Sequence, residues 1–386
     1  MCMEEWTPLE EGTFNKLRLN SPPGGWFPAL QDLFWCITET NLPCADLFFS
    51  PYLRRISIYA LWSWDNTTLP LPTLAPIISA LPTSRLEQMS VGVVSHKLSW
   101  AQLEDSFSSV ILRCGSSFTD YNSSVPLSNA ALDHLIHLPH LRTWRIHGPP
   151  PTYSASSLPL VFPPLRELTL GEGAARGWLP LLRRLEDGAS TAQCMTPLSK
   201  AKEFLKVLYI GDVSGINIGA SSVSTIQCFR NLARLCVDVN CHDEDDRGEC
   251  VFELNNDNVT ELAMALTRLE SLILGYPCFE NTCLTTVACL LPISVYCSKL
   301  EELMIHFNTT NIVDDFKNIL EDPRFQPLRS LPKCPLTSLN VYRTPIGLHE
   351  SDFGAVARGM VDIFPSLRYC EGLEDWGYWD ELSMKI

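Results

Sequence analysis

One short phrase recurs along the whole chain and limits what it can fold into. Leu165–Leu170 reads Leu-x-x-Leu-x-Leu, and Leu141–Ile146, Leu269–Leu274 and Leu300–Ile305 follow the same pattern. Self-similarity at a fixed spacing is the signature of a repeat architecture, and this phrase is the one typical of leucine-rich repeats. The sequence therefore predicts a chain built from stacked copies of one small unit.

Each phrase predicts a short strand, and amphipathic segments between the phrases predict helices. Roughly thirteen phrases occur at an average spacing of about 29 residues, near the range for leucine-rich repeats. The expected strands are 14–19, 30–35, 53–58, 86–91, 118–121, 141–146, 165–170, 205–210, 232–237, 269–274, 300–305, 336–341 and 367–370. The expected helices are 74–81, 100–114, 129–138, 178–185, 221–229, 258–267, 284–296, 312–320 and 352–364.

We expect one domain over residues 1–386, an α/β leucine-rich-repeat solenoid of the ribonuclease-inhibitor-like horseshoe type. Its repeats are irregular, with parallel strands on a concave face and helices outside. The aromatic, aperiodic segment 374–386 is expected to cap the last repeat. Ser128 and Ser351 are expected to cap helices, Pro76 to fit only a first helical turn, and Leu168 to be buried.

Charge and cysteine content narrow the class of partner and the compartment. A formal net charge of −15 and a pI near 5.0 disfavour nucleic-acid and anionic-membrane binding and favour a basic partner or none. The 15 cysteines contain no C-x-x-C pair, and several, including Cys36, Cys114 and Cys236, occupy apolar positions. With no signal-peptide pattern at the amino terminus, we expect reduced thiols in a cytoplasmic or nuclear protein.

Several repeat phrases resemble one known family. Phe48–Ile56, Leu138–Ile146, Phe162–Leu170 and the closing Trp379–Leu382 are similar to the repeat region of fungal F-box proteins with leucine-rich repeats. That resemblance implies substrate presentation to a cullin-based ubiquitin ligase, with an F-box that docks a Skp-type adaptor. The only stretch like an F-box opening is 42–47, and we expect the box itself to be absent. Adaptor binding is then expected only if an F-box is supplied.

Three groups of residues could suggest chemistry, and each has a simpler interpretation. The loop Gly171–Gly177 follows a strand but has the wrong glycine spacing for a dinucleotide site. His134, His137 and His140 lie at steps of three, but Pro139 breaks the helix before His140, and Cys236, Cys241, His242 and Cys250 match no standard zinc spacing. We therefore predict no catalytic residue, no cofactor, no metal and no enzymatic activity.

The concave face of the solenoid is the best binding surface that the sequence predicts. In Leu-x-x-Leu-x-Leu the third, fifth and seventh residues point away from the core, because strand side chains alternate. We predict protein recognition there by a monomer, as the substrate-binding region of an F-box-like adaptor or, alternatively, as a stand-alone scaffold or regulator. The candidate residues are Arg55, Tyr59, Arg145, His147, Glu167, Tyr209, Arg234, Asp238, Glu302, His306 and Tyr342, with Thr143, Met304 and Asn340 on the same face.

Overall fold

The chain forms two compact units, Met1–Pro164 and Leu165–Ile386, and each is described by itself. The computed structural model describes residues 11–20, 22, 26–37, 42–60, 71–93, 101–147, 164–171, 203–211, 217–218, 220–237, 251–275, 284–323, 325–342 and 352–372. The expectation of a single domain over 1–386 stays a prediction.

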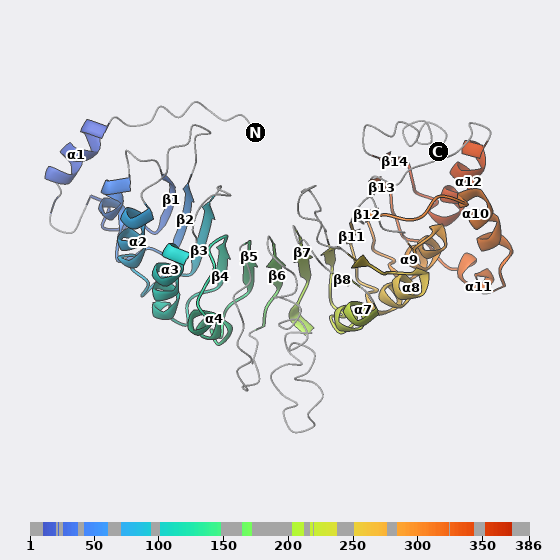
Figure 1. Ribbon diagram of the computed structural model, residues 1–386, viewed down its shortest axis with the longest axis horizontal. Helices are drawn as coiled ribbons and strands as arrows, with labels where there is room; N and C mark the ends of the chain where they lie inside the picture. The colour runs from blue at the N-terminus through green and yellow to red at the C-terminus, as the bar shows by residue number, and fades with distance from the viewer. Residues whose placement is uncertain are drawn as a thin grey trace, which may run out of the picture. The chain divides into compact units, whose positions relative to one another are not determined.

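The first unit is a parallel sheet with helices along one of its faces (Figure 1). Its strands follow the order β1-β2-β3-β4-β5, and every neighbouring pair is parallel. Its elements are α1 (Glu11–Leu19), β1 (Asp32–Ile37), the 3-10 helix η1 (Leu42–Phe48), β2 (Arg55–Ala60), α2 (Leu71–Ser79), β3 (Gln88–Val93), α3 (Ala101–Arg113), β4 (Asp120–Ser123), α4 (Asn129–Ile136) and β5 (Thr143–Ile146).

The second unit repeats the same arrangement. Its parallel strands follow the order β6-β7-β9-β11-β12-β13-β14, and a separate parallel pair joins β8 to β10. Its elements are β6 (Glu167–Leu170), β7 (Val207–Ile210), β8 (Asn217–Ile218), α7 (Ala220–Ile226), β9 (Arg234–Val237), β10 (Val251–Phe252), α8 (Asn256–Ala265), β11 (Ser271–Leu274), η2 (Val287–Cys289), α9 (Leu290–Tyr296), β12 (Glu302–Ile305), α10 (Ile312–Glu321), α11 (Gln326–Arg329), β13 (Ser338–Tyr342), α12 (Phe353–Ile363) and β14 (Tyr369–Gly372).

The second leucine of the phrase forms a continuous buried ladder through the second unit. Register pairing aligns it from strand to strand, and each member is at most 1% exposed: Leu168, Leu208, Leu235, Leu272, Leu303 and Leu339. In the first unit Ile56, Met89, Tyr121 and Trp144 take this position, and each is at most 2% exposed. One repeat therefore buries its apolar side chains against the next, as a solenoid requires.

A repeated backbone contact fixes how successive units stack. The carbonyl of Arg54 accepts hydrogen bonds from the amides of Glu87 and Gln88, at 2.7 and 3.0 Å. The carbonyl of Glu270 accepts from Glu301 and Glu302 in the same way, at 2.9 and 3.1 Å. Because this contact recurs where strands begin, the backbone supplies the register and the leucines supply the core.

The fold is thus an α/β leucine-rich-repeat solenoid, and its repeats are irregular as predicted. Register partners lie 23 residues apart between β1 and β2, at Asp32 and Arg55, and 40 apart between β6 and β7, at Glu167 and Val207. Twelve of the predicted strands and the described predicted helices are present, with boundaries shifted by a few residues. The strand pair β8–β10 and the short helix α11 were not predicted.

One predicted strand is wrong. Residues 14–19 lie within helix α1, whose Leu17 packs against Leu47 of η1, and the Trp26 indole donates to the Leu17 carbonyl at 2.7 Å. Phe14, Leu17 and Leu19 fit the repeat phrase, but a spacing of three also fits one face of a helix. A short apolar run cannot separate the two structures by itself.

Two smaller predictions can also be compared with the structure. Ser128 caps α4 as predicted, its hydroxyl accepting from the Ala131 amide at 3.3 Å. Pro76 was expected in a first turn, but α2 begins at Leu71 and Pro76 lies inside it. Because Pro76 has no N–H, the helix lacks one intrahelical hydrogen bond. Burial of Leu74 and Ile78 offsets this loss. Predictions for 178–185, Ser351 and 374–386 lie outside the described residues.

Candidate functional site: the helix-free face of the strands

Each unit has a sheet face that its described helices leave uncovered, here called the helix-free face. Along β2, Arg55 is exposed, Ile56 is buried, Ser57 is half-buried, Ile58 is buried and Tyr59 is half-buried. This alternation is the one predicted from the repeat phrase, because successive strand side chains point to opposite faces. The buried set faces the helices, and the other set lies on the helix-free face.

The structure places the predicted residues on this face, in two groups. Arg55, Tyr59 and Arg145 line one hollow of the first unit, while His147 directly follows β5 and does not line it. In the second unit the face carries Glu167, Tyr209, Arg234, Glu302 and His306. Tyr342 ends β13, where only the backbone is described, and Asp238 lies outside the described residues. That these residues bind a partner stays a prediction.

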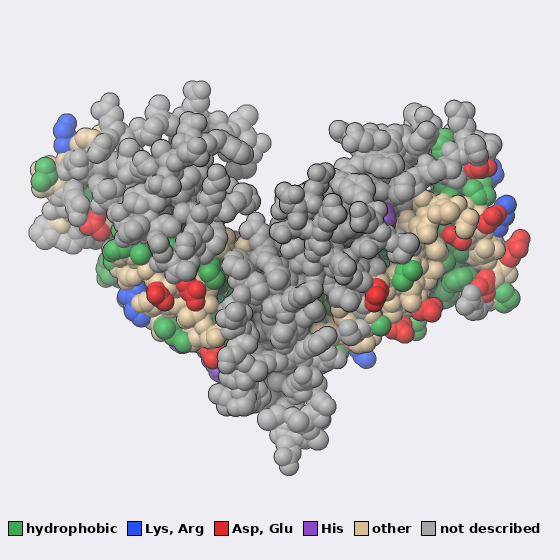
Figure 2. Space-filling model, in the orientation of Figure 1, with side chains coloured by type: hydrophobic (Ala, Val, Ile, Leu, Met, Phe, Trp, Pro, Cys, Tyr) green, Lys and Arg blue, Asp and Glu red, His purple; other side chains and the backbone are tan. Residues whose placement is uncertain are grey.

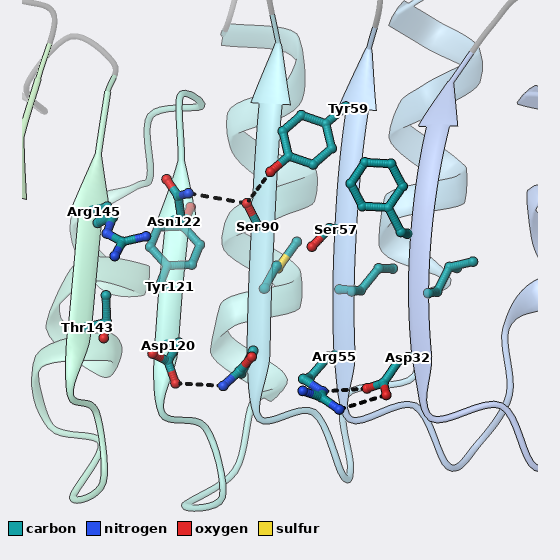
Figure 3. A pocket seen from close by; sticks show the side chains of 15 residues that line it. Asp32, Arg55, Ser57, Tyr59, Ser90, Asp120, Tyr121, Asn122, Thr143 and Arg145 are labelled. Carbon is teal, nitrogen blue, oxygen red and sulfur yellow. Dashed lines mark hydrogen bonds and ion pairs between the residues drawn. The ribbon is translucent and has the colours of Figure 1, made fainter. Parts of the chain in front are cut away.

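The hollow on the first unit is the most defined feature of the helix-free face (Figure 3). Its volume is about 480 Å³, and it is lined entirely by residues of β1 to β5. The lining residues are Asp32, Leu33, Phe34, Arg55, Ile56, Ser57, Tyr59, Gln88, Met89, Ser90, Asp120, Tyr121, Asn122, Thr143 and Arg145. A sheet is a rigid support, so these side chains are held at fixed spacings by the strand register.

One end of the hollow is closed by a two-point ion pair. Arg55 Nε donates to Asp32 Oδ1 at 2.5 Å, and Nη2 donates to Oδ2 at 2.7 Å. The hydrogen bond with Asp32 raises the pKa of Arg55 above its ordinary value, which keeps the guanidinium protonated. Both side chains are exposed, and each neutralises the other's charge.

An aromatic pair stands beside that ion pair. The ring of Phe34 lies 5.2 Å from the ring of Tyr59, measured between centroids, and Phe34 is 73% exposed. Tyr59 also lies across Gly92 on the next strand, where an added methyl group would meet its Cδ1 at 2.8 Å. Gly92 therefore provides the space that holds the Tyr59 ring flat on the face.

Polar groups fill the middle and far end of the hollow. Asn122 Nδ2 donates to Ser90 Oγ at 3.2 Å, and the Tyr59 hydroxyl lies 3.5 Å from the same oxygen. Asp120 accepts from Gln88 Nε2 at 3.2 Å and from the Thr119 hydroxyl at 2.5 Å. Both donors to Asp120 are neutral, and Arg145 on the neighbouring strand β5 adds a positive charge to the same hollow.

Sequence reasoning missed most of this hollow although the necessary signal was present. Asp32 and Phe34 are the third and fifth residues of the phrase that begins at Leu30. The same positions of the two phrases on β3 and β4 supply the rest of the polar lining: Gln88, Ser90, Asp120 and Asn122. The rule that selected Arg55 and Arg145 selects them equally.

A second, smaller hollow lies where strands of the first unit begin. It has a volume of about 320 Å³ and includes Arg54, Arg85 and Tyr52. The Arg85 guanidinium lies 4.6 Å above the Tyr52 ring, and Arg54 forms an ion pair with Glu87. Its cations are therefore already engaged with an aromatic face or a carboxylate.

The helix-free face of the second unit is lined by the same strand positions. Ser271 Oγ donates to Glu302 Oε2 at 2.7 Å across neighbouring strands. Burial lowers the pKa of His306 to about 4, so its imidazole is neutral at physiological pH. The Tyr209 ring lies over Gly211, which directly follows the same strand, whereas Tyr59 lies over a glycine of the neighbouring strand.

Two cysteines predicted in apolar slots lie on the helix-free face instead. Cys36 on β1 and Cys236 on β9 are half-buried, while their strand neighbours Trp35, Leu235 and Val237 are buried. Both follow the second leucine position by an odd number of residues, so strand alternation directs them away from the helices. The prediction considered only the hydrophobicity of cysteine and therefore assigned both residues to apolar core positions.

The histidine group makes separate backbone contacts rather than converging. His134 Nε2 lies 3.0 Å from the Cys114 carbonyl, and His137 Nδ1 lies 2.6 Å from the Asp133 carbonyl. Within the described ranges, no three His, Cys, Asp or Glu side chains are grouped so as to hold a metal ion. Residues 172–177 of the glycine loop lie outside the described residues. The same holds for Cys241, His242 and Cys250.

Other surfaces of the described chain are less distinctive. Figure 2 shows acidic, basic and hydrophobic side chains interspersed over the helices. None of the helices in the described ranges combines the length and the apolar character needed to cross a membrane.

Comparisons with known proteins give distant structural neighbours. No protein-family model matches the chain, and no curated protein matches it. A crystal structure of the Rad7 and Elc1 complex in yeast aligns with a TM-score of 0.42 at 15% identity, covering 82% of this chain and 70% of that one. An internalin, InlF, from Listeria monocytogenes aligns with a TM-score of 0.32 at 14% identity, covering 78% and 77%.

The class of the protein follows from its own repeats. Parallel strands paired side by side, a leucine ladder between them and helices on one face define a leucine-rich-repeat protein.

Proposed function

We propose that this chain is a protein-recognition module that binds its partner on the helix-free face of its strands. The observation that carries the proposal is the hollow on β1 to β5, where an exposed aromatic ring stands among ordered polar side chains. Aromatic and arginine side chains on a rigid support are typical of binding hot spots. Repeat proteins commonly use the strand face of a solenoid for such contacts.

Charge favours a protein over a nucleic acid as the partner. The net charge of −15 repels a phosphate backbone, which basic proteins bind by releasing its counterions. In the hollow itself Asp32 and Arg55 form an ion pair, and Asp120 and Arg145 add one charge of each sign. The preference for a partner with basic side chains therefore rests on the net charge of the whole chain.

The more specific proposal is that the chain is the substrate-binding repeat region of an F-box-like ubiquitin-ligase adaptor. Its support is the resemblance of the repeat phrases to that family. The expected absence of an F-box depended partly on assigning 14–19 to a strand, and these residues form helix α1. Helices α1 and η1 pack through Leu17 and Leu47, so the helical content before β2 exceeds the expectation.

Affinity purification with mass spectrometry tests the recognition proposal. A variant carrying Arg145→Ala, Tyr209→Ala and Arg234→Ala should retain fewer co-purifying proteins than the original chain. The matched control carries Arg230→Ala, Met264→Ala and Arg358→Ala, three exposed changes outside the helix-free face. If both variants retain the same partners, with unchanged melting temperatures, the face is not the recognition surface.

A direct pull-down with a purified Skp-type adaptor tests the ligase link. We expect no stoichiometric complex, because no F-box was identified in the sequence. Stoichiometric binding that is lost on Leu47→Asp would place a degenerate box in the region of α1 and η1. If the chain binds partners but no adaptor, also when an F-box is fused to it, the result favours the stand-alone scaffold or regulator.

A further inference from the structure

We propose that the smaller hollow of the first unit binds a carboxylate side chain of a partner protein, an aspartate or a glutamate, through Arg85. This hollow lies beside the turns that lead into β2, β3 and β4. It shares no lining residue with the larger hollow on β1 to β5. The surface is therefore separate from the one proposed above for partner recognition.

A turn that recurs before each strand places the lining side chains next to one another. The Leu86 amide donates to the Thr83 carbonyl at 3.2 Å, and the same bond closes the turns before β2 and β4 at 3.1 Å. The residue that directly precedes each repeat phrase is exposed, and these residues are Tyr52, Arg85 and Ser117. Because β2, β3 and β4 are adjacent parallel strands, the three side chains form a row with Arg85 in the middle.

The guanidinium of Arg85 is held by an aromatic ring and keeps its hydrogen-bond donors. Its carbon lies 4.6 Å from the centroid of the Tyr52 ring. That contact uses the charge of the guanidinium and needs none of its N–H groups. Among the described residues, the Arg85 side chain forms no hydrogen bond and no ion pair. Its planar set of donors therefore remains for the two oxygens of a carboxylate.

The other cation of the hollow is already neutralised. Arg54 Nε and Nη2 both donate to Glu87 Oε1, at 2.8 and 2.5 Å. Among the described residues that line the hollow, Glu87 is the only carboxylate, so the charge of Arg85 is left uncompensated. One guanidinium matches the single charge of a carboxylate better than the double charge of a phosphate group.

Charges next to the hollow have the same sign. The second position of each repeat phrase follows the row from β1 to β5 and holds Gln31, Arg54, Glu87, Thr119 and Arg142. Together with Arg85, these positions carry three arginines and one glutamate. The two aspartates at the start of β1 and β4 line the larger hollow, where two arginines balance them. A carboxylate is therefore favoured at this edge, even though the chain as a whole carries a net charge of −15.

Neutral side chains beside Arg85 can complete the hydrogen bonds of a carboxylate. Gln31 and Ser84 line the hollow, and neither side chain has a hydrogen-bond partner among the described residues. A primary amide and a hydroxyl are both donors. Ser117 differs, because its hydroxyl already donates to the Leu86 carbonyl at 3.3 Å. The hollow therefore offers donors besides Arg85 for the remaining lone pairs of the bound carboxylate.

Selection from a phage-displayed library of random dodecapeptides on the immobilised full chain tests the inference. Phage that bind the Arg85→Gln chain are removed first, so the selection retains peptides that need Arg85. These peptides should share an aspartate or a glutamate, although the net charge of −15 disfavours acidic peptides in general. Added salt should weaken their binding.

A double-mutant cycle with a synthetic peptide of the most enriched sequence locates the contact. Replacing the shared acidic residue by its amide should lower the affinity for the original chain by about tenfold or more. The same replacement should have little effect on the Arg85→Gln chain, because the contact is already lost there. Arg85→Lys keeps the charge without the planar donors and should retain only part of the affinity.

Two further variants separate this contact from other effects. Arg358→Gln removes the same charge from an exposed position of the second unit and should leave the affinity unchanged. Glu87→Gln removes the lining carboxylate and releases Arg54, so it should raise the affinity about threefold or more. A gain in affinity cannot come from unfolding, and equal melting temperatures establish that the other variants fold.

Specific outcomes overturn the inference. They are the absence of retained phage, retained peptides without an acidic residue, and an equal effect of the amide replacement on the original and Arg85→Gln chains. A lower affinity on Glu87→Gln would overturn it as well. None of these outcomes bears on the helix-free face, whose test above uses other residues.

Discussion

Leu168 shows what a single core position contributes to a repeat protein. It is 0% exposed and lies opposite Leu208 in the ladder, as expected from its place in the repeat phrase. Replacing it by aspartate would bury a charge that no neighbour can pair. We expect Leu168→Asp to lower the free energy of unfolding by several kcal/mol, roughly 3 or more.

Thermal melting of this variant measures the loss, and Arg166→Asp is the matched control. Arg166 is exposed two residues earlier, and only its backbone carbonyl takes part in the register contact. The Arg166→Asp variant gains the same charged side chain at an exposed position, so its melting temperature should change little. Equal melting of both variants would contradict the assignment of Leu168 to the core.

His306 makes stability depend on pH in a predictable direction. Its folded pKa is lowered to about 4 by burial, below the ordinary value of 6.5. The folded state therefore favours the neutral ring, and the contribution is fully present above about pH 6.5. As pH falls toward 4 the unfolded state takes up the proton first, and roughly 3 kcal/mol of stability is lost.

The His306→Gln variant should lack this part of the pH dependence. Chemical denaturation at pH 7 and at pH 4.5 gives the difference in unfolding free energy for each chain. The original chain should lose more stability on acidification than the variant does. An identical loss in both would mean that the imidazole is not held in a neutral form by the fold.

At the scale of elements, strand alternation explains both what the sequence predicted and what it missed. It correctly placed Arg55, Tyr59 and Arg145 on the helix-free face. It could not show that a hollow forms over β1 to β5, because that depends on which side chains are short. Ser57 and Ser90 leave space there, and Gly92 allows the Tyr59 ring to lie flat.

Helix α1 is a case in which the repeat phrase predicted the wrong structure. Its residues satisfy the strand phrase, yet they form a helix that packs on η1. A repeat phrase specifies a strand only where a neighbouring strand can accept its backbone hydrogen bonds. That condition is a property of the stacked repeats, so it is not visible within six residues.

Capping of α4 gives a prediction at the same scale. The Ser128 hydroxyl accepts from the Ala131 amide, which otherwise has no partner in the first turn. We expect Ser128→Ala to cost about 1 kcal/mol of unfolding free energy. Ser109→Ala, an exposed change inside α3, should be neutral or slightly stabilising because alanine favours helix interiors. Denaturation midpoints of the two variants compare the effects directly.

Across the whole molecule, packing sets the chemistry of the cysteines. Cys114, Cys297 and Cys334 are buried, and none of these three forms a disulfide. Burial raises the pKa of both Cys114 and Cys297 to about 12 and that of Cys334 above its ordinary value. The thiolate is the reactive form, so these thiols are suppressed as long as the repeats stay folded.

The last prediction follows from that suppression. In native protein, Ellman's reagent should label these buried cysteines slowly, and unfolding in guanidinium should make all of them reactive. The half-buried Cys228 on the surface after α7 provides an internal reference for faster labelling. Because we expect the thiols to act as small core residues in a reducing compartment, dithiothreitol should leave the melting temperature unchanged. A lower melting temperature with dithiothreitol would instead reveal a disulfide that supports the fold, and the cytoplasmic or nuclear prediction would then be wrong.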